Sequence, residues 1–179
     1  MKLTDREIEF LKESNAIERE YSKEALEDAI ESWGYSKIIT PLGRSIDIQY
    51  IKTIHKFLMK RLDSRIAGKI REVDVWVGNR KCLNPKEINE SLSKWCERAN
   101  LRFLNSPKDI AIKEIEQIHV EFEKIHPFED GNGRTGRILM NIQRLRSHID
   151  ISIIHEGKEQ MEYYKWFTKG KQEVMEEGE

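Results

Sequence analysis

The segment 126–137 reads HPFEDGNGRTGR and brings together a base, an acid, a glycine-rich turn and two cations. His126 precedes a proline, and an imidazole at such a helix end can exchange a proton near neutral pH. Asp130 offers carboxylate oxygens, which are ligands that Mg²⁺ prefers. Gly131 and Gly133 allow unusual backbone angles and the close approach of a ligand. These residue types in this order indicate phosphate chemistry, in which a hydroxyl attacks a bound nucleotide.

A helix that begins near Asn132 would complete a phosphate site. The free N–H groups of a first helical turn bind anions, and the helix dipole favours negative charge there. Arg134 and Arg137 lie on one face of this turn, and each can fork onto phosphate oxygens. Because cations are disfavoured at a helix N-terminus, a bound anion is expected to offset them. Asp130 would hold a Mg²⁺ ion that bridges phosphates, and His126 would take the proton of the attacking hydroxyl.

Each feature alone also has a structural interpretation. A Gly-Asn-Gly sequence is usually only a turn, and a histidine before proline is more often a capping or hydrogen-bonded residue than a base. The presence of all these features within 126–137 argues against a simple turn.

Two helices are predicted to position this segment. Apolar residues recur at helical spacing from Ile112 to Ile125. This helix should stop at His126, because Pro127 disfavours helical geometry in the residue before it. The next helix should begin near Asn132. The segment therefore forms the loop of a helix–loop–helix junction, where a histidine is partly exposed.

Most of the remaining chain also shows helical patterns. Thr4 with Glu7 looks like a capping box, Asn84 before Pro85 is a start signal, and Gly34 fits just past a helix end. The further predicted helices follow Thr4, cover 26–33 and 51–62, follow Asn84, and span roughly 157–169.

Residues 69–77 differ from this helical pattern. Val73, Val75 and Val77 alternate there with polar or bulky neighbours, between glycine-containing turns. A period of two predicts a strand or a hairpin.

Composition limits the class of protein. The 179 residues suit one domain, and 31 basic against 32 acidic residues argue against a general nucleic-acid binder. Cys82 and Cys96 form no CxxC pair, so we expect free thiols and no zinc site. The chain has no run of 18 apolar residues, and its charged start is no secretory signal. We therefore expect a cytoplasmic protein without contact to a membrane.

The segment HPFEDGNGRTGR resembles the signature of the Fic-domain family, HxFx(D/E)GNGRxxR, at every defined position. The resemblance extends over roughly residues 45–168. It implies an all-α fold, a Fic-type helical bundle with a small β-hairpin flap near 69–77. It also implies a protein adenylyltransferase, which transfers AMP from ATP to a Ser, Thr or Tyr hydroxyl of a target protein and of itself, with Mg²⁺ as cofactor and pyrophosphate as product.

The resemblance assigns a role to each residue of the motif. His126 would be the general base, and Asp130 would ligate Mg²⁺. Phe128 would be structural. Gly133 supports the adenylylating orientation of the nucleotide, because the related death-on-curing kinases carry a lysine and no second glycine here. The phosphates would be held by an anion hole of Gly131, Asn132 and Gly133, and by Arg134 and Arg137.

Two further parts of the site are implied less directly. Tyr164, in the C-terminal helix, would stack on the adenine ring, although an aromatic at helical spacing is more often a core residue. The flap would align the target by main-chain pairing, or the hairpin simply packs on helices, and both can hold. The flap residues implied by the resemblance are Ile70, Arg71, Glu72, Val73, Asp74 and Val75.

An inhibitory helix is predicted at the N-terminus. Ser14 and Glu18 match the family pattern (S/T)xxxE(G/N), whereas Arg19 departs from it. Glu18 would pair with Arg137 and so occupy the cation that the γ-phosphate needs, while Ser14 would hold the helix in place. The alternative is that SxxxE is merely a common pattern. We expect one compact domain, with N-terminal helices at 1–34 and a core at 35–179.

Three alternatives to AMP transfer remain open from the sequence. The same residues are also compatible with removal of AMP from a protein or with transfer of another nucleotide. The alternative of another class is a nucleotide-binding regulatory protein with little turnover. ATP and a protein target are the expected partners, with homodimer formation as a further expectation. No direct binding of nucleic acid is expected.

Overall fold

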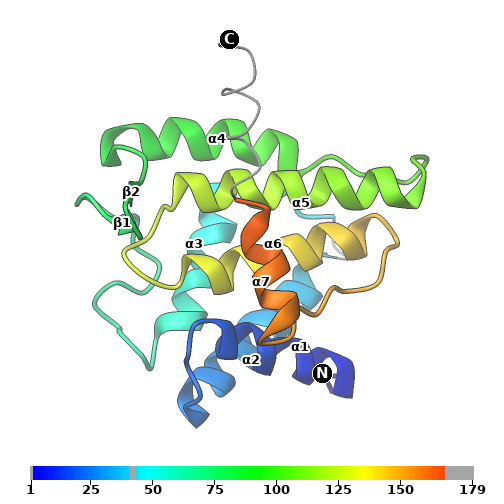
Figure 1. Ribbon diagram of the computed structural model, residues 1–179, viewed down its shortest axis with the longest axis horizontal. Coiled ribbons are helices and arrows are strands. Elements are labelled where there is room, and N and C mark those ends of the chain that lie inside the picture. The colour runs from blue at the N-terminus through cyan, green and yellow to red at the C-terminus, as the bar shows by residue number, and fades with distance from the viewer. Residues whose placement is uncertain (1, 41–42, 168–179) are drawn as a thin grey trace.

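The computed structural model describes residues 2–40 and 43–167, and its helices surround a buried central helix, α6 (Figure 1). Two short strands form a single antiparallel hairpin. The helices are α1 (Asp5–Ile17), α2 (Lys23–Ile39), α3 (Ile48–Met59), α4 (Ile88–Ala99), α5 (Lys108–Ile125), α6 (Asn132–Arg146) and α7 (Lys158–Lys165), with a short 3₁₀ helix at Pro85–Glu87. The strands are β1 (Trp76–Val77) and β2 (Arg80–Lys81). The prediction of an all-α fold with a small hairpin is confirmed.

Local start signals explain where several helices begin. The side chain of Thr4 accepts a hydrogen bond from the backbone N–H of Glu7, and Glu7 bonds back to Thr4 as a capping box. The side chains of Ser22 and Asp47 cap α2 and α3 by accepting hydrogen bonds from the backbone N–H groups of Ala25 and Tyr50. Glu7 also accepts a hydrogen bond from Trp33 Nε1 at 2.9 Å, which ties the start of α1 to α2.

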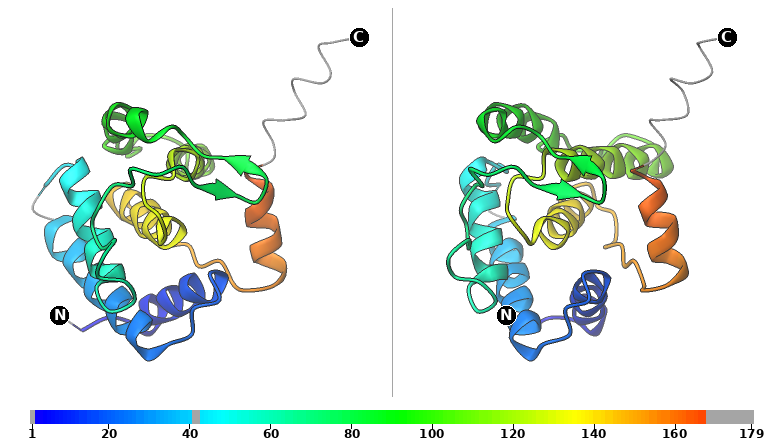
Figure 2. Two further views of the ribbon diagram at one scale, coloured as in Figure 1. Left: turned by 90° about the vertical axis from the view of Figure 1, so that its left-hand side faces the viewer. Right: turned by 60° about the vertical axis from the view of Figure 1, so that its left-hand side comes forward.

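Helix α6 occupies the middle of the molecule. In the left view of Figure 2, α1 lies below it, α7 to its right and the hairpin above it. Most residues of α6 are buried, including Arg134 and Arg137. Its apolar residues Ile138, Leu139 and Ile142 join the main core with Phe122 of α5. The start of α6 therefore lies where α1, α5, α7 and the hairpin can all contribute side chains.

The hairpin lies at the end of the predicted range and beyond it. Trp76 pairs with Lys81 and Val77 pairs with Arg80, around a turn in which Gly78 has a φ of 57°. Of the predicted range 69–77, only Trp76 and Val77 belong to a strand. The alternating valines mark extended backbone, and ladder pairing begins only where Gly78 allows the chain to reverse.

Two helix ends also differ from the sequence prediction. Helix α2 continues through Gly34 to Ile39, so the predicted end at Gly34 is wrong. Residues beyond it, such as Tyr35 and Ile39, pack on the core and extend the helix. Helix α7 ends at Lys165, before the predicted end at 169, although 168–169 lie outside the described residues.

The N-terminal helices share the main core with the rest of the chain. Phe10 and Leu11 of α1 belong to the same apolar cluster as Ile54 and Phe122. The predicted division at residue 34 stays a prediction, and part of 35–179 lies outside the described residues. None of the helices in the described part of the chain has the length and apolar character that a bilayer crossing requires.

Candidate active site

The loop between α5 and α6 is held by its own side chains. His126 ends α5 in the left-handed region, with a φ of 50°, and its backbone N–H donates to the carbonyl of Phe122. Phe128 is fully buried and stacks on His55 with a centroid distance of 3.7 Å. The side-chain amide of Asn132 bonds both to the N–H and to the carbonyl of Phe128, each at 2.9 Å. The loop is thus held by contacts of its own residues, and Asn132 contributes its side chain to it.

His126 has the properties of a base at neutral pH. Its side chain is 18% exposed and borders the cavity described below. Burial lowers the pKa of His126 to about 4, and the guanidinium groups of Arg71 and Arg80 act in the same direction. The imidazole is therefore neutral near pH 7 and can accept a proton.

Glycines make room at the start of α6. Gly131 has a φ of 72°, and a Cβ atom there would lie 2.8 Å from Met59 Sδ. A Cβ atom on Gly133 would collide with the Glu18 carboxylate and lie 3.0 Å from Arg137 Nη1. The Glu18 carboxylate thus sits directly above the first turn of α6, where the helix dipole favours an anion.

Arg137 is buried and held mainly by α1. Its Nε donates to Ser14 Oγ at 2.9 Å, and its Nη2 donates to the Ser14 carbonyl at 2.8 Å and to Glu18 Oε1 at 2.7 Å. The hydroxyl of Tyr163 lies 3.4 Å from its Nη1. The predicted Glu18–Arg137 ion pair is therefore present, and Ser14 contacts the same guanidinium. Although burial opposes the charge, Tyr163 and Glu18 raise the pKa of Arg137 above its ordinary value.

The backbone at the end of α1 explains why the inhibitory pattern prefers glycine or asparagine after the glutamate. Glu18 is the C-cap of α1, and the next residue, Arg19, has a φ of 56°. This left-handed conformation is the one that glycine and asparagine adopt most readily after a helix. Arg19 adopts it too, so the departure from the pattern introduces local strain and leaves the ion pair in place.

Arg134 is a buried cation with free donors. Its residue is 4% exposed, and burial lowers the pKa of its guanidinium. Its Nη2 contacts Met59 Sδ at 3.3 Å and lies 3.9 Å from Asp130 Oδ2. Within the described residues, its Nε and Nη1 have no hydrogen-bond partner. Buried N–H donors without partners are costly, so this guanidinium suits an anionic ligand such as a phosphate.

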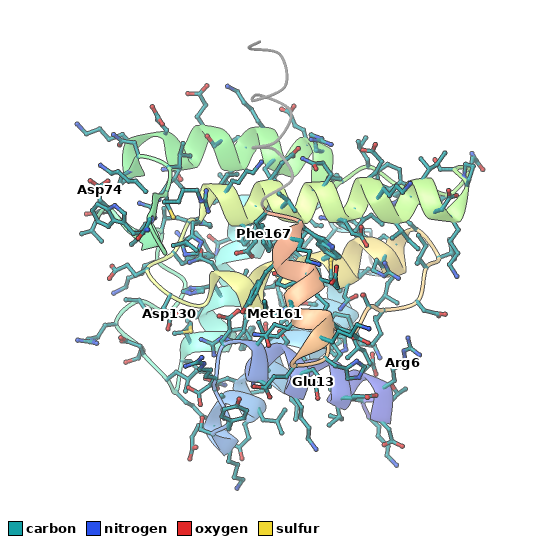
Figure 3. All side chains as sticks on the ribbon, in the orientation of Figure 1. Arg6, Glu13, Asp74, Asp130, Met161 and Phe167 are labelled. Carbon is teal, nitrogen blue, oxygen red and sulfur yellow. The ribbon has the colours of Figure 1, made fainter. Side chains whose placement is uncertain are left out.

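The carboxylate of Asp130 could bind a cation such as Mg²⁺ together with phosphate oxygens. Asp130 lies on the loop ahead of α6, with a side chain that is 71% exposed (Figure 3). Its Oδ1 accepts a hydrogen bond from the N–H of Gly131 at 2.6 Å, which orients the carboxylate. Among the described residues, no group of three or more acidic, histidine or cysteine side chains could hold a metal. A lone carboxylate fits Mg²⁺, which binds one or two carboxylates together with phosphates and water.

Glu18, His126, Gly133 and Arg137 border a cavity of about 770 Å³. The predicted site residues Asp130, Gly131, Asn132 and Arg134 are not among its lining residues. The cavity is large enough for a nucleotide-sized ligand. Tyr164 borders it with 41% of its surface exposed, and its hydroxyl accepts a hydrogen bond from Gln160. The lining residues come from α1, the hairpin, α5, α6 and α7: Glu18, Val77, Asn79, Arg80, Glu123, His126, Gly133, Arg137, Tyr163, Tyr164 and Phe167.

The predicted flap residues do not border this cavity. Arg71 is 2% exposed, so its side chain faces inward, and the prediction that the flap aligns a target through its main chain stays a prediction. The side chain is drawn inward because it bonds to backbone carbonyls on both sides of the hairpin. Glu72, Val73 and Asp74 are exposed, and Figure 3 shows Asp74 at the outer edge of the molecule. Ile70 and Val75 are partly buried.

Several cavity residues were missed by the reasoning from sequence, among them Arg80, Tyr163 and Glu123. Arg80 comes from β2, and Tyr163 is buried against Arg137, while its hydroxyl lies 2.9 Å from His119 Nε2. Glu123 is buried, and its Oε2 lies 4.0 Å from His126 Nδ1. The spacing of Glu123 and His126, three residues along a helix, was a usable signal. The contacts of Arg80 and Tyr163 depend on chain folding and left no such signal.

Glu123 makes stability depend on pH. Burial raises the pKa of Glu123 to about 8, whereas its unfolded value is 4.5. Between these values the folded state keeps a proton that the unfolded state loses, so this residue lowers stability as pH rises. Relative to the native chain, Glu123→Gln should gain on the order of 2 kcal/mol of unfolding free energy between pH 5.5 and pH 8.

Urea unfolding at both pH values measures this difference, with Glu24→Gln as a control for an exposed glutamate. If the difference in unfolding free energy between the native chain and Glu123→Gln does not change with pH, the pKa of Glu123 is not raised by burial and the prediction is wrong.

Comparisons with known proteins agree with this arrangement. The model of the Fic/DOC family matches residues 45–143. A protein adenylyltransferase fic-1 of Caenorhabditis briggsae is 30% identical over 149 residues, which cover 82% of this chain and 28% of the relative. The protein adenylyltransferase fic-1 of Caenorhabditis elegans is 32% identical over 122 residues, which cover 66% of this chain and 23% of the relative. The chain thus spans about a quarter of the length of these curated relatives.

Solved structures show the same fold. Residues 134–508 of Fic-1 from C. elegans superpose with a TM-score of 0.80 at 19% identity, covering 94% of this chain and 56% of that one. A Fic-domain-containing signalling protein from Bacteroides thetaiotaomicron gives a TM-score of 0.70 at 20% identity. The superposition covers 90% of this chain and 69% of that protein's chain. At these sequence identities, the structural similarity shows the fold alone.

Proposed function

Because the chain belongs to the Fic/DOC family, we propose that it transfers AMP from ATP to a hydroxyl group of a protein. One observation carries this proposal. A neutral histidine, His126, borders the same cavity as Gly133 and the buried Arg137 of α6, and a second buried arginine, Arg134, lies in the first turn of that helix. The names of the relatives, protein adenylyltransferases, support the reaction class.

The proposed reaction is an in-line displacement at the α-phosphorus. His126 takes the proton from a Ser, Thr or Tyr hydroxyl of the target. The hydroxyl oxygen forms a bond to the α-phosphorus of ATP, and the bond from that phosphorus to the bridging oxygen of the β-phosphate breaks. Pyrophosphate leaves. Arg134 and Arg137, with the N–H groups of Gly131, Asn132 and Gly133, would hold the phosphates and stabilise their charge.

Mg²⁺ is part of this proposal, with Asp130 as its protein ligand. The ion would neutralise phosphate charge and orient the triphosphate. The exposed, oriented carboxylate of Asp130 beside Arg134 supports this assignment. The adenine ring would lie toward Tyr164 at the α7 side of the cavity.

The protein target would dock on the hairpin. The hairpin is two-stranded, so each strand has an open edge that a peptide can pair with through its main chain. Val77, Asn79 and Arg80 border the cavity, so a segment paired there would lie beside His126. Side-chain contacts of the target would fall on these residues more than on 70–75.

The α1 helix is proposed to restrain the reaction. Glu18 occupies Arg137 and the space above Gly133. A triphosphate that uses the same cation would have to displace the Glu18 carboxylate, so nucleotide binds poorly until α1 moves.

Incubation with ATP labelled at either the α- or the γ-phosphate tests the transfer. We expect label on protein from α-labelled ATP with Mg²⁺, none from γ-labelled ATP, and none with EDTA. Label from γ-labelled ATP alone would indicate phosphorylation and contradict the proposal. Label from UTP or GTP in preference to ATP would indicate another nucleotide, and release of AMP from a premodified protein would indicate removal. Binding of ATP without any label would indicate a nucleotide-binding regulator.

A further inference from the structure

Arg71 is a buried cation without an acidic partner. It lies between α3 and β1, and only 2% of its surface is exposed. Within the described part of the chain its guanidinium forms no ion pair and bonds only to backbone carbonyl oxygens. Burying a guanidinium is costly, so a side chain in this position is expected to satisfy its donors very well.

The carbonyl partners of Arg71 belong to three separate segments. Its Nε donates to the carbonyl of His126 at 2.7 Å, and its Nη2 lies 3.5 Å from that of Ile125. Its Nη1 donates to the carbonyl of Val73 at 2.7 Å, on the chain that enters the hairpin. Its Nη2 donates to the carbonyl of Leu83 at 2.5 Å, on the chain that leaves it. One side chain therefore joins both legs of the hairpin to the end of α5.

The backbone of Arg71 adds a fifth connection to the same loop. Its N–H donates to the carbonyl of Pro127 at 3.0 Å, so the residue holds the peptides on both sides of Pro127. His126 has a left-handed backbone, which is unfavourable for a residue with a side chain and persists only where its surroundings enforce it. The hydrogen bonds from Arg71 to His126 and Pro127 provide that enforcement.

We propose that Arg71 is a positioning residue that fixes the hairpin and His126 in one relative geometry. A peptide paired with the hairpin then presents its hydroxyl at the distance and angle that the imidazole requires. This inference rests on the proposed AMP transfer, in which His126 is the base. Arg71 does not border the cavity and acts through the groups that it holds.

The charge of Arg71 also acts on the imidazole. The groups that face His126 are Glu123 of α5, Glu18 at the end of α1, Arg80 of β2 and Arg71 itself. Removing the Arg71 cation should make protonation of His126 easier, whereas a lysine keeps the charge.

Two variants separate the charge from the geometry. In Arg71→Met we expect the pKa of His126, followed by NMR of the ring signals, to rise, because one of the cations that lower it is removed. In Arg71→Lys it should stay near the native value, because the charge remains. Since lysine cannot reach three segments at once, hydrogen exchange at residues 73–83 should be about tenfold faster in both variants. AMP transfer to protein should fall at least about tenfold in both, with unchanged affinity for ATP.

The control is Arg65→Met, which removes an exposed arginine that pairs with its neighbour Asp63. It should match the native chain in all measurements. If Arg71→Met does not fold, Arg71→Lys decides the question. Native exchange in the hairpin together with a native transfer rate in Arg71→Lys would overturn the proposal. If neither the native protein nor Glu18→Gln, which lacks the acid that pairs with Arg137, transfers AMP, the proposed function fails, while the NMR titration and the exchange rates still decide whether Arg71 holds His126 and the hairpin together.

Discussion

Replacing His126 by asparagine is expected to lower AMP transfer by at least about a hundredfold, because asparagine cannot accept the proton of the attacking hydroxyl. Asparagine is preferred to alanine for this test because His126 has a φ of 50°, a conformation that asparagine tolerates well. The fold should therefore persist. The rate of label transfer from α-labelled ATP to protein, measured in a single turnover with saturating Mg²⁺, gives the effect.

The chain offers a closely matched control for this substitution. His148 is exposed, lies at the end of α6 and has a φ of 56°, so His148→Asn makes the same change in the same backbone conformation. It should transfer AMP at the native rate. Binding of ATP to His126→Asn should also stay native, because the arginines and the helix start are intact. If His126→Asn transfers AMP at the native rate, His126 is not the base and the proposed mechanism is wrong.

Local sequence signals account for the parts of the site that were predicted. The stop of α5 at His126 follows from Pro127, and the start of α6 at Asn132 follows from the glycine-rich turn. The capping box of Thr4 is equally local. Such signals involve residues within one helical turn of each other, so a single sequence contains them in full.

The parts that were missed depend on contacts between distant segments. Arg71 looked like one residue of an exposed strand, and only the folded chain shows that its partners lie in α5 and on both legs of the hairpin. Tyr163 and Tyr164 are adjacent, yet one is buried against Arg137 and the other borders the cavity more openly. Which of the two tyrosines is buried depends on the rotation of α7 about its axis. In a helix this short, the spacing of apolar residues does not define that rotation.

The predicted contact between Glu18 and Arg137 is the exception among long-range contacts. The two residues are 119 positions apart, and the resemblance alone linked them. The structure adds that Ser14 binds the same guanidinium through both its hydroxyl and its carbonyl. The end of α1 therefore surrounds Arg137 with acceptors, of which only Glu18 carries a charge that opposes a phosphate.

Replacing Glu18 by glutamine is expected to tighten ATP binding and to raise AMP transfer by about tenfold or more. Arg137 is almost completely buried, and Glu18 is the acid that pairs with it. The other nearby acid, Glu123, has a pKa of about 8 and is largely neutral at pH 7. Without the Glu18 charge, the first turn of α6 holds two buried cations and attracts a triphosphate more strongly. Because Glu18 is itself 38% exposed, losing the pair should cost about 1 kcal/mol of stability or less.

A variant that strengthens the Glu18–Arg137 pair should lower AMP transfer. Arg19→Gly removes the strain of a left-handed arginine and should stabilise the end of α1 by about 1 kcal/mol. The Glu18–Arg137 pair would then be held more firmly, and transfer should fall severalfold. Calorimetric ATP affinity with Mg²⁺ and single-turnover transfer measure both effects, with Glu24→Gln as the control for removing an exposed carboxylate. Unchanged ATP affinity and transfer in Glu18→Gln would show that α1 does not restrain the site, because the ion pair would then yield to nucleotide at no measurable cost.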